Sequence, residues 1–379
     1  MLLYFRIYLF LIFSSFLIPI LDFPLYLSNI DIVSFGKIPF ILMFFTSILY
    51  HIKHNLFLPS VSKIIIFSFF IAIGSSIFYG NILSSAHISH IYALTMPIFS
   101  ISIGYNFYNI YQKSDFIKVH FQKIINVSFV FSIVLSFFYI YFYFITNQWG
   151  YFGFATSMPL FFGYILTNNP KHAYFGFFVN IFTGKRSGIL ITLFFLIKRI
   201  KYRSIFKKPL WTLVLVFFFI IAFIQLNDLH IFDRFEMIFD LDFQDAFSIF
   251  MATGGRFTEI ISVLDHLNNN PFMYFSGSGI GGKYLFVDPR SEFPNELMHY
   301  THFSPTFYLF LIGLPLTILI YTLILKEFKY INKKEPITYI FLSFFINSFF
   351  GSIMFVDPRF WFFFGCLLGY KKFKSISYV

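Results

Sequence analysis

Arg256 is a candidate for binding an anionic group, because it follows two glycines, Gly254 and Gly255. A guanidinium forms paired hydrogen bonds with phosphate oxygens, and glycine lets the backbone approach an anion closely. The alternative is a glycine turn followed by an arginine that forms a salt bridge with Glu259 or Asp265. The apolar residues that follow predict an amphipathic helix opening at this arginine, with Phe257, Ile260, Ile261 and Leu264 on its apolar face.

Two histidines, His299 and His302, stand three residues apart shortly before an apolar segment. Imidazole exchanges a proton near neutral pH, so either residue could act as a general base. On one face of a helix the pair could bind zinc, but Glu296 is their one close helper and no other well-spaced His or Cys completes a site. We therefore predict no metal. A satisfied histidine at a membrane interface is the remaining alternative.

Between these two places lies a glycine-rich segment that runs from Asn270 to Gly282. Glycine allows positive backbone torsions, and backbone amides in such a segment can turn toward an anion, so Gly279 and Gly281 are candidate substrate contacts. The segment lacks the Gly-Lys-Ser/Thr ending and the strand–helix context of a nucleotide-binding loop, which excludes that class of site. A flexible surface turn is the alternative.

Lys185 and Arg186 occupy a turn between two short apolar segments, 173–183 and 187–197. A helix of about 11 residues reaches only about 16 to 17 Å, so the pair is interpreted as a hairpin whose tip stops inside the membrane. Both cations would then line a recessed, hydrated pocket, because ionisable groups at membrane depth usually serve a ligand or a pathway. An ordinary basic loop, with the arginine reaching the headgroups, is the alternative.

Apolar helices must position these residues. Of the 379 residues 58% are hydrophobic and 12% are charged, and the mean hydropathy is +0.75, which is more apolar surface than a soluble protein of this size could bury. Since a spanning helix needs about 20 apolar residues, we predict an all-α polytopic transmembrane bundle of about twelve spans. The predicted segments are Phe5–Leu21, Phe35–Tyr50, Lys63–Tyr79, Ile88–Phe107, Ile124–Thr146, Tyr151–Thr167, Ala173–Thr183, Ser187–Ile197, Leu210–Gln225, Pro305–Leu325, Ile337–Gly351 and Arg359–Tyr370.

The distribution of charge predicts the orientation of this bundle. Basic residues remain on the cytoplasmic side of a membrane, and most of the 28 lysines and arginines fall in alternate loops if both termini are cytoplasmic. The net charge of +11 is thereby explained as a topology signal, which argues against nucleic acid as a partner. We expect a single membrane domain over 1–379, with spans at 5–225 and 305–370 and a large periplasmic loop at 226–304 that is ordered and partly helical. The first span is predicted to remain as a span, since it lacks a small-residue cleavage site.

The order of these features resembles the O-antigen polymerase and O-antigen ligase superfamily of bacterial inner membranes. In that family an Arg-Ser/Gly tip joins two short helices, and a large periplasmic loop then begins with an arginine-led helix. The loop passes through a segment resembling Asn-Pro-x-x-x-x-x-Gly-x-Gly-x-Gly and ends at a histidine before an apolar helix containing Gly-Leu. The matching positions here are Lys185 to Gly188, Gly255 and Arg256, Asn270 to Gly282, His302, and Gly313 and Leu314, with Arg359 as a weaker match near the end.

This resemblance covers the chain well from about Phe175 onward, and the N-terminal spans match only as hydrophobic topology. It implies glycosyl transfer from sugars linked to undecaprenyl pyrophosphate, without a cofactor. Arg256, Arg186 and Lys185 would hold the pyrophosphate, and His302 would deprotonate the attacking hydroxyl, with His299 and Arg359 as further substrate contacts. Membrane lipids are expected partners, as are a chain-length regulator and a flippase of the same pathway.

Three functions stay open at this point. The ligase branch typically has an asparagine after its histidine, whereas Phe303 follows His302 here, which favours a polymerase that joins lipid-linked repeat units. A ligase that transfers the polysaccharide to lipid A-core is the first alternative. A transporter of lipid-linked sugars is the second, although a periplasmic loop of this length and the lack of an evident inverted repeat argue against transport.

Overall fold

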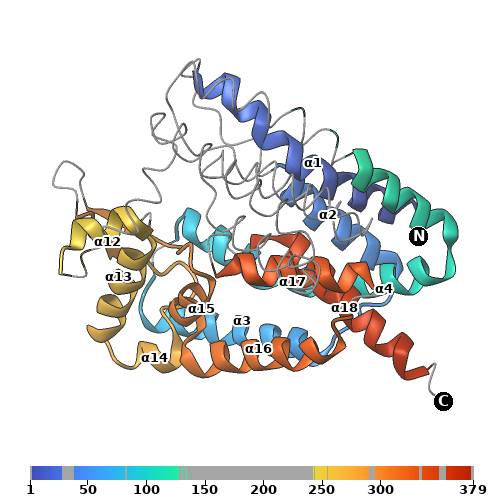
Figure 1. Ribbon diagram of the computed structural model, residues 1–379. Helices are drawn as coiled ribbons and strands as arrows, with labels where there is room; N and C mark the ends of the chain where they lie inside the picture. The colour runs from blue at the N-terminus through green and yellow to red at the C-terminus, as the bar shows by residue number, and fades with distance from the viewer. Residues whose placement is uncertain are drawn as a thin grey trace, which may run out of the picture.

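The computed structural model describes residues 2–27, 38–127, 242–289, 295–349 and 356–376, except for isolated positions 82, 243, 254, 333 and 334. These residues are mostly helical, which agrees with the predicted all-α class (Figure 1). The predicted segments from Tyr151 to Gln225, and most of the segment that begins at Ile124, lie outside the described residues. A helix over residues 115–127 precedes that part of the chain.

Seven of the predicted segments coincide with described helices. The first four correspond to α1 (Leu2–Leu27), α2 (Ile38–Lys53), α3 (Ser60–Phe78) and α4 (Ser85–Lys113). The last three correspond to the pair α15 (Ser304–Ile312) and α16 (Leu314–Lys326), to α17 (Pro336–Ser348) and to α18 (Pro358–Ile376). The bounds differ from the predicted ones by a few residues at the helix ends.

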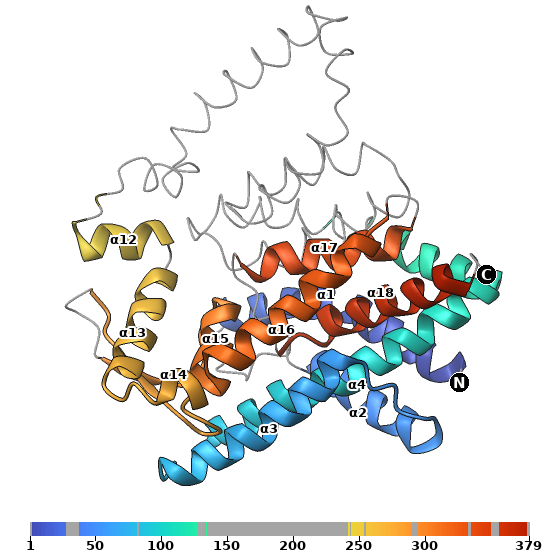
Figure 2. The same cartoon turned by 90° about the horizontal axis from the view of Figure 1, so that it is seen from below.

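Helices α4 and α18 form the centre of the bundle, although they are far apart in the sequence (Figure 2). A Cβ added at Gly104 would lie 2.0 Å from the carbonyl oxygen of Phe362, and one added at Gly365 would lie 2.1 Å from that of Ile101. The absence of side chains at these two glycines therefore brings the helix backbones into direct contact, which is a common way for membrane helices to associate.

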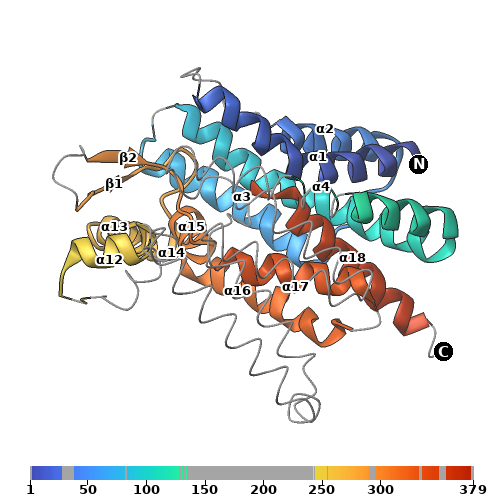
Figure 3. The same cartoon turned by 45° about the horizontal axis from the view of Figure 1, so that its top comes forward.

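Both termini lie at one end of the bundle, and the segment from α12 to β2 lies at the other end (Figure 3). This segment contains α12 (Ala246–Thr253), α13 (Arg256–Asn268) and α14 (Met273–Ser276), followed by strands β1 (Tyr284–Phe286) and β2 (Glu296–Met298). The strands pair antiparallel, with Tyr284 opposite Met298 and Phe286 opposite Glu296. The described part of the predicted loop is thus partly helical, while its periplasmic location stays a prediction.

The predicted segment from Pro305 to Leu325 is wrong in one respect, because it is two helices that meet at Gly313. Gly313 has a φ of +82°, and a Cβ there would lie 2.3 Å from the carbonyl oxygen of Phe275. The positive torsion interrupts the helix and lets α14 contact the break directly. The break therefore anchors the loop segment to the helices beneath it.

Two of the described helices, α3 and α4, are long and apolar enough to cross a membrane. Shorter apolar stretches occur at Leu2–Ser15, Ile38–Lys53 and Pro336–Ile346. The expected total of about twelve spans stays a prediction, because a large part of the chain between α4 and α12 lies outside the described residues.

Candidate functional site

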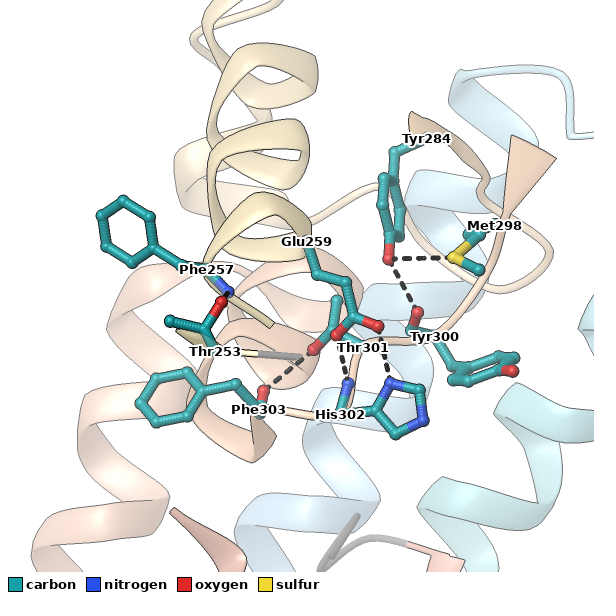
Figure 4. Close-up of polar contacts among 9 residues, drawn as sticks. All are labelled: Thr253, Phe257, Glu259, Tyr284, Met298, Tyr300, Thr301, His302 and Phe303. Atoms are coloured by element: carbon teal, nitrogen blue, oxygen red, sulfur yellow. Dashed lines mark hydrogen bonds and ion pairs between the residues drawn. The ribbon is translucent and has the colours of Figure 1, made fainter. Parts of the chain in front are cut away.

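A short polar contact joins His302, just before α15, to Glu259 of α13 (Figure 4). The Nδ1 atom of His302 lies 2.6 Å from Oε1 of Glu259, and the backbone N–H of His302 donates to Oε2 at 2.8 Å. One carboxylate thus binds both the ring and the main chain of the same histidine. The side chain of Glu259 is 7% exposed, whereas that of His302 is 42% exposed.

This geometry determines which ring nitrogen of His302 can react. A carboxylate at Nδ1 favours the tautomer that carries its proton there, which leaves Nε2 as the basic nitrogen. Figure 4 shows the second ring nitrogen turned away from Glu259. An imidazole that is oriented by a carboxylate and is 42% exposed has a geometry suited to general-base catalysis.

Contacts around the backbone hold His302 in place. The hydroxyl of Tyr284, on β1, donates to the carbonyl oxygen of Tyr300 at 2.8 Å, and the ring of Tyr300 packs edge-on against His302 with the ring centroids 5.5 Å apart. The hydroxyl of Thr301 donates to the carbonyl oxygen of Phe303 at 2.9 Å. The hairpin β1–β2 thereby fixes the chain that presents the imidazole.

Helix α13 begins at Arg256, as the sequence predicted, and Gly255 caps it with a φ of +79°. Burial lowers the pKa of Arg256, and the negative charge of Glu259 one turn further along opposes that shift. The guanidinium is therefore a partly desolvated cation on the same helix as the carboxylate that holds His302. A cation with reduced hydration interacts strongly with an incoming anion.

The predicted apolar face of α13 is not the face that enters the core. Phe257 and Ile261 are 44% and 43% exposed, whereas the buried positions are Glu259, Ser262, Val263 and Leu267. The apolar repeat located the helix correctly. On the buried face Val263 and Leu267 pack with Tyr284 and Phe310, and Glu259 contacts His302.

His299 occupies a different setting from His302. Its carbonyl oxygen lies 2.6 Å from Nε2 of His90 on α4, and its ring centroid lies 5.9 Å from that of His90. His299 and His302 do not share a helical face, because both lie in the irregular segment between β2 and α15. Glu296 accordingly faces Phe286 across the hairpin in the strand register.

The glycine segment packs closely against the helices. A Cβ at Gly279, where φ is +76°, would lie 2.4 Å from the backbone nitrogen of Ser76, and a Cβ at Gly281, where φ is +80°, would collide with the ring of His87. The positive torsions were predicted, but the backbone amides from 278 to 282 donate within the protein. Their acceptors are Phe310 O, Leu311 O, Ala72 O, His90 Nδ1 and Gly279 O, in order.

Because these amides are already bonded, the observed role of the segment is to fix the loop on α3, α4 and α15. Contact of Gly279 or Gly281 with a substrate stays a prediction. His90, which the sequence analysis did not single out, binds the glycine segment through Nδ1 and the chain before His302 through Nε2. A histidine inside an apolar helix was the available signal.

Arg359 lies in a buried ion pair. Its Nε and Nη2 atoms bind Asp357 at 2.8 and 2.7 Å, its Nη1 lies 3.2 Å from Ser15 Oγ, and the guanidinium lies over the ring of Phe40. The two charged side chains are 13% and 7% exposed. This pairing joins α18 to α1 and α2, while a substrate role for Arg359 stays a prediction.

The other predicted cations, Lys185 and Arg186, lie outside the described residues. Arg256, Glu259 and His302 lie at one end of the bundle.

Among the described residues, no group of three His, Cys, Asp or Glu side chains could hold a metal ion. Glu259 was not among the predicted site residues except as a partner of Arg256. No family model, no curated protein and no solved structure matches this chain.

Proposed function

We propose that this protein is a membrane glycosyltransferase that joins oligosaccharide repeat units linked to undecaprenyl pyrophosphate, as an O-antigen polymerase of the bacterial inner membrane does. The observation that carries the proposal is the Glu259–His302 pair beside the Arg256 end of α13. A base and a cation in one place suit the transfer of a sugar from a pyrophosphate to a hydroxyl group.

In the proposed reaction Nε2 of His302 takes the proton of the acceptor hydroxyl as its oxygen attacks the anomeric carbon of the donor. The bond from that carbon to the pyrophosphate oxygen breaks, and the lipid pyrophosphate leaves with the electron pair. Glu259 stabilises the imidazolium that forms. Arg256, together with Arg186 and Lys185, stabilises the negative charge that grows on the leaving group. No cofactor takes part in these steps.

The surface of the described helices supports the membrane part of the proposal. On α3 small residues face inward, with Ser68 and Ala72 buried, whereas Phe70 and Ile77 are 64% and 77% exposed. A helix with small residues on the face that packs against other helices, and with large apolar side chains on its exposed face, suits a lipid environment. We therefore propose about twelve spans with both termini cytoplasmic and the loop segment periplasmic.

The function is tested by deleting the gene and restoring it as wild type or as His302→Gln, Glu259→Gln or Arg256→Ala, with surface glycolipids separated on a gel. Loss of the polysaccharide ladder, leaving core with a single repeat, is expected for the deletion and for all three variants. Asp265→Asn is the matched control, because it removes a carboxylate from an exposed position of α13 and should restore the ladder.

Other outcomes separate the alternatives. Bare core without any repeat would identify a ligase that transfers polysaccharide to lipid A-core. An unchanged ladder in the deletion strain would contradict both enzymes. Lipid-linked repeats retained on the cytoplasmic side would identify a transporter instead.

A further inference from the structure

A cavity of about 710 Å³ opens at the end of the bundle opposite to His302. Its walls come from the start of α3, from Tyr105 of α4, and from the ends of α16 and α18. The 3-10 turn η2 (Glu327–Tyr330) completes the lining. The cavity is therefore at the end where both termini lie (Figure 1).

The rim of the cavity carries a net positive charge. Four lysines and one carboxylate contribute to its lining, and the ammonium group of Lys371 binds Oε1 of Glu327 at 2.8 Å. Aromatic rings support two of the cations, because Lys372 lies 5.6 Å from the ring centroid of Tyr105 and Lys371 lies 5.2 Å from that of Tyr330. The lysines of the lining are Lys326, Lys371, Lys372 and Lys374.

The inner lining is apolar. Phe57 and Tyr105 stack with their ring centroids 3.6 Å apart and their planes 8° apart, and Val61 and Leu368 contribute buried aliphatic surface. A cationic rim above an apolar floor matches an amphipathic molecule whose charged group lies close to hydrocarbon.

Two further groups could bind a polar ligand. Helix α3 begins at Ser60 without a side-chain cap, so its first amide groups are donors that favour an anion. Glu327 is 8% exposed, and its Oε2 atom has no hydrogen-bond partner among the described residues. That oxygen could accept a hydrogen bond from a hydroxyl group in the cavity.

We propose that this cavity binds the headgroup of an anionic phospholipid of the surrounding membrane. The lysines and the start of α3 bind the phosphate diester, Glu327 Oε2 accepts a hydrogen bond from a headgroup hydroxyl, and the apolar floor receives the glycerol end of the acyl chains. Basic pockets between membrane helices commonly bind anionic lipids on the cytoplasmic side. This site is independent of the chemistry at His302.

The test is native mass spectrometry of the full-length protein in detergent with added phosphatidylglycerol or phosphatidylcholine of identical acyl chains. We expect one retained phosphatidylglycerol, and we expect Lys326→Gln/Lys372→Gln to weaken its retention about tenfold or more. Lys113→Gln/Lys123→Gln is the matched control, because it removes two exposed lysines that do not line the cavity. The charge-retaining double variant Lys326→Arg/Lys372→Arg should bind like wild type, which separates lost charge from misfolding.

Equal retention of phosphatidylcholine, or an equal loss in the control and cavity variants, would overturn the proposal. Displacement of phosphatidylglycerol by millimolar inorganic phosphate would also overturn it, since the occupant would then be a free anion.

Discussion

Glu259 and His302 are 43 residues apart in the sequence, yet one carboxylate contacts both the Nδ1 atom and the backbone N–H of the histidine. The double contact fixes the ring orientation as well as the position of the chain that carries it. A substitution at Glu259 therefore changes the setting of the imidazole without removing it.

Glu259→Gln should lower glycosyl transfer by at least about 10²-fold, because an amide stabilises an imidazolium less well than a carboxylate does. The rate is measured with purified protein and lipid-linked repeat units, as the conversion of single repeats into chains. Asp265→Asn, on the same helix, should keep the wild-type rate. A Glu259→Gln enzyme as fast as wild type would show that the contact only holds α13 in place.

Gly279→Ala should destabilise the protein by roughly 1–3 kcal/mol or more, because its Cβ would meet the backbone of Ser76 at 2.4 Å in a left-handed conformation. Gly74→Ala on α3 is the control. A Cβ there has no atom within 4 Å, so the change should be neutral or stabilise the helix by up to about 1 kcal/mol. Thermal unfolding in detergent measures both, and an equal Tm for the two variants would contradict the packing role.

The long apolar helices of this fold were predictable from sequence because an apolar segment is recognised by its own composition. The start of α13 at Arg256 was also predictable, because the glycines before it and the apolar repeat after it are local signals. The break at Gly313 was not predicted. It is in contact with Phe275 of α14, which lies 38 positions earlier in the sequence.

The partners of the site residues were not predictable. Nothing near Glu259 in the sequence indicates that its carboxylate contacts His302. The sequence suggested only Arg256 as its partner. The same holds for His90, whose two ring nitrogens connect the glycine segment to the chain at His299. Such contacts depend on how distant elements pack, which periodicity does not encode.

Asp357→Asn should destabilise the protein by about 3–5 kcal/mol, because it leaves the guanidinium of Arg359 as a buried charge without its carboxylate. Replacing both members, as Arg359→Met/Asp357→Leu, should recover most of that loss, since no buried charge remains. Thermal unfolding of both variants measures the stability. Glycosyl transfer by the double variant gives a second result, because retained activity would exclude Arg359 as a substrate contact.

His266, in the last turn of α13, should make the docking of that helix sensitive to acid. Its ring lies 5.7 Å from that of Phe310, and burial lowers its pKa below the ordinary value of 6.5. The unfolded chain therefore binds a proton at a higher pH than the folded one, so stability is lost as the pH falls below about 6.5.

His266→Gln cannot gain a charge, so its Tm should fall less than that of wild type between about pH 7.5 and pH 5. His120→Gln, in the helix at residues 115–127, is the control and should keep the wild-type dependence. Hydrogen exchange of the amides of α13 at both pH values locates the effect. Wild type should open this helix more readily at the lower pH, and unchanged exchange there would show that protonation of His266 does not loosen the site.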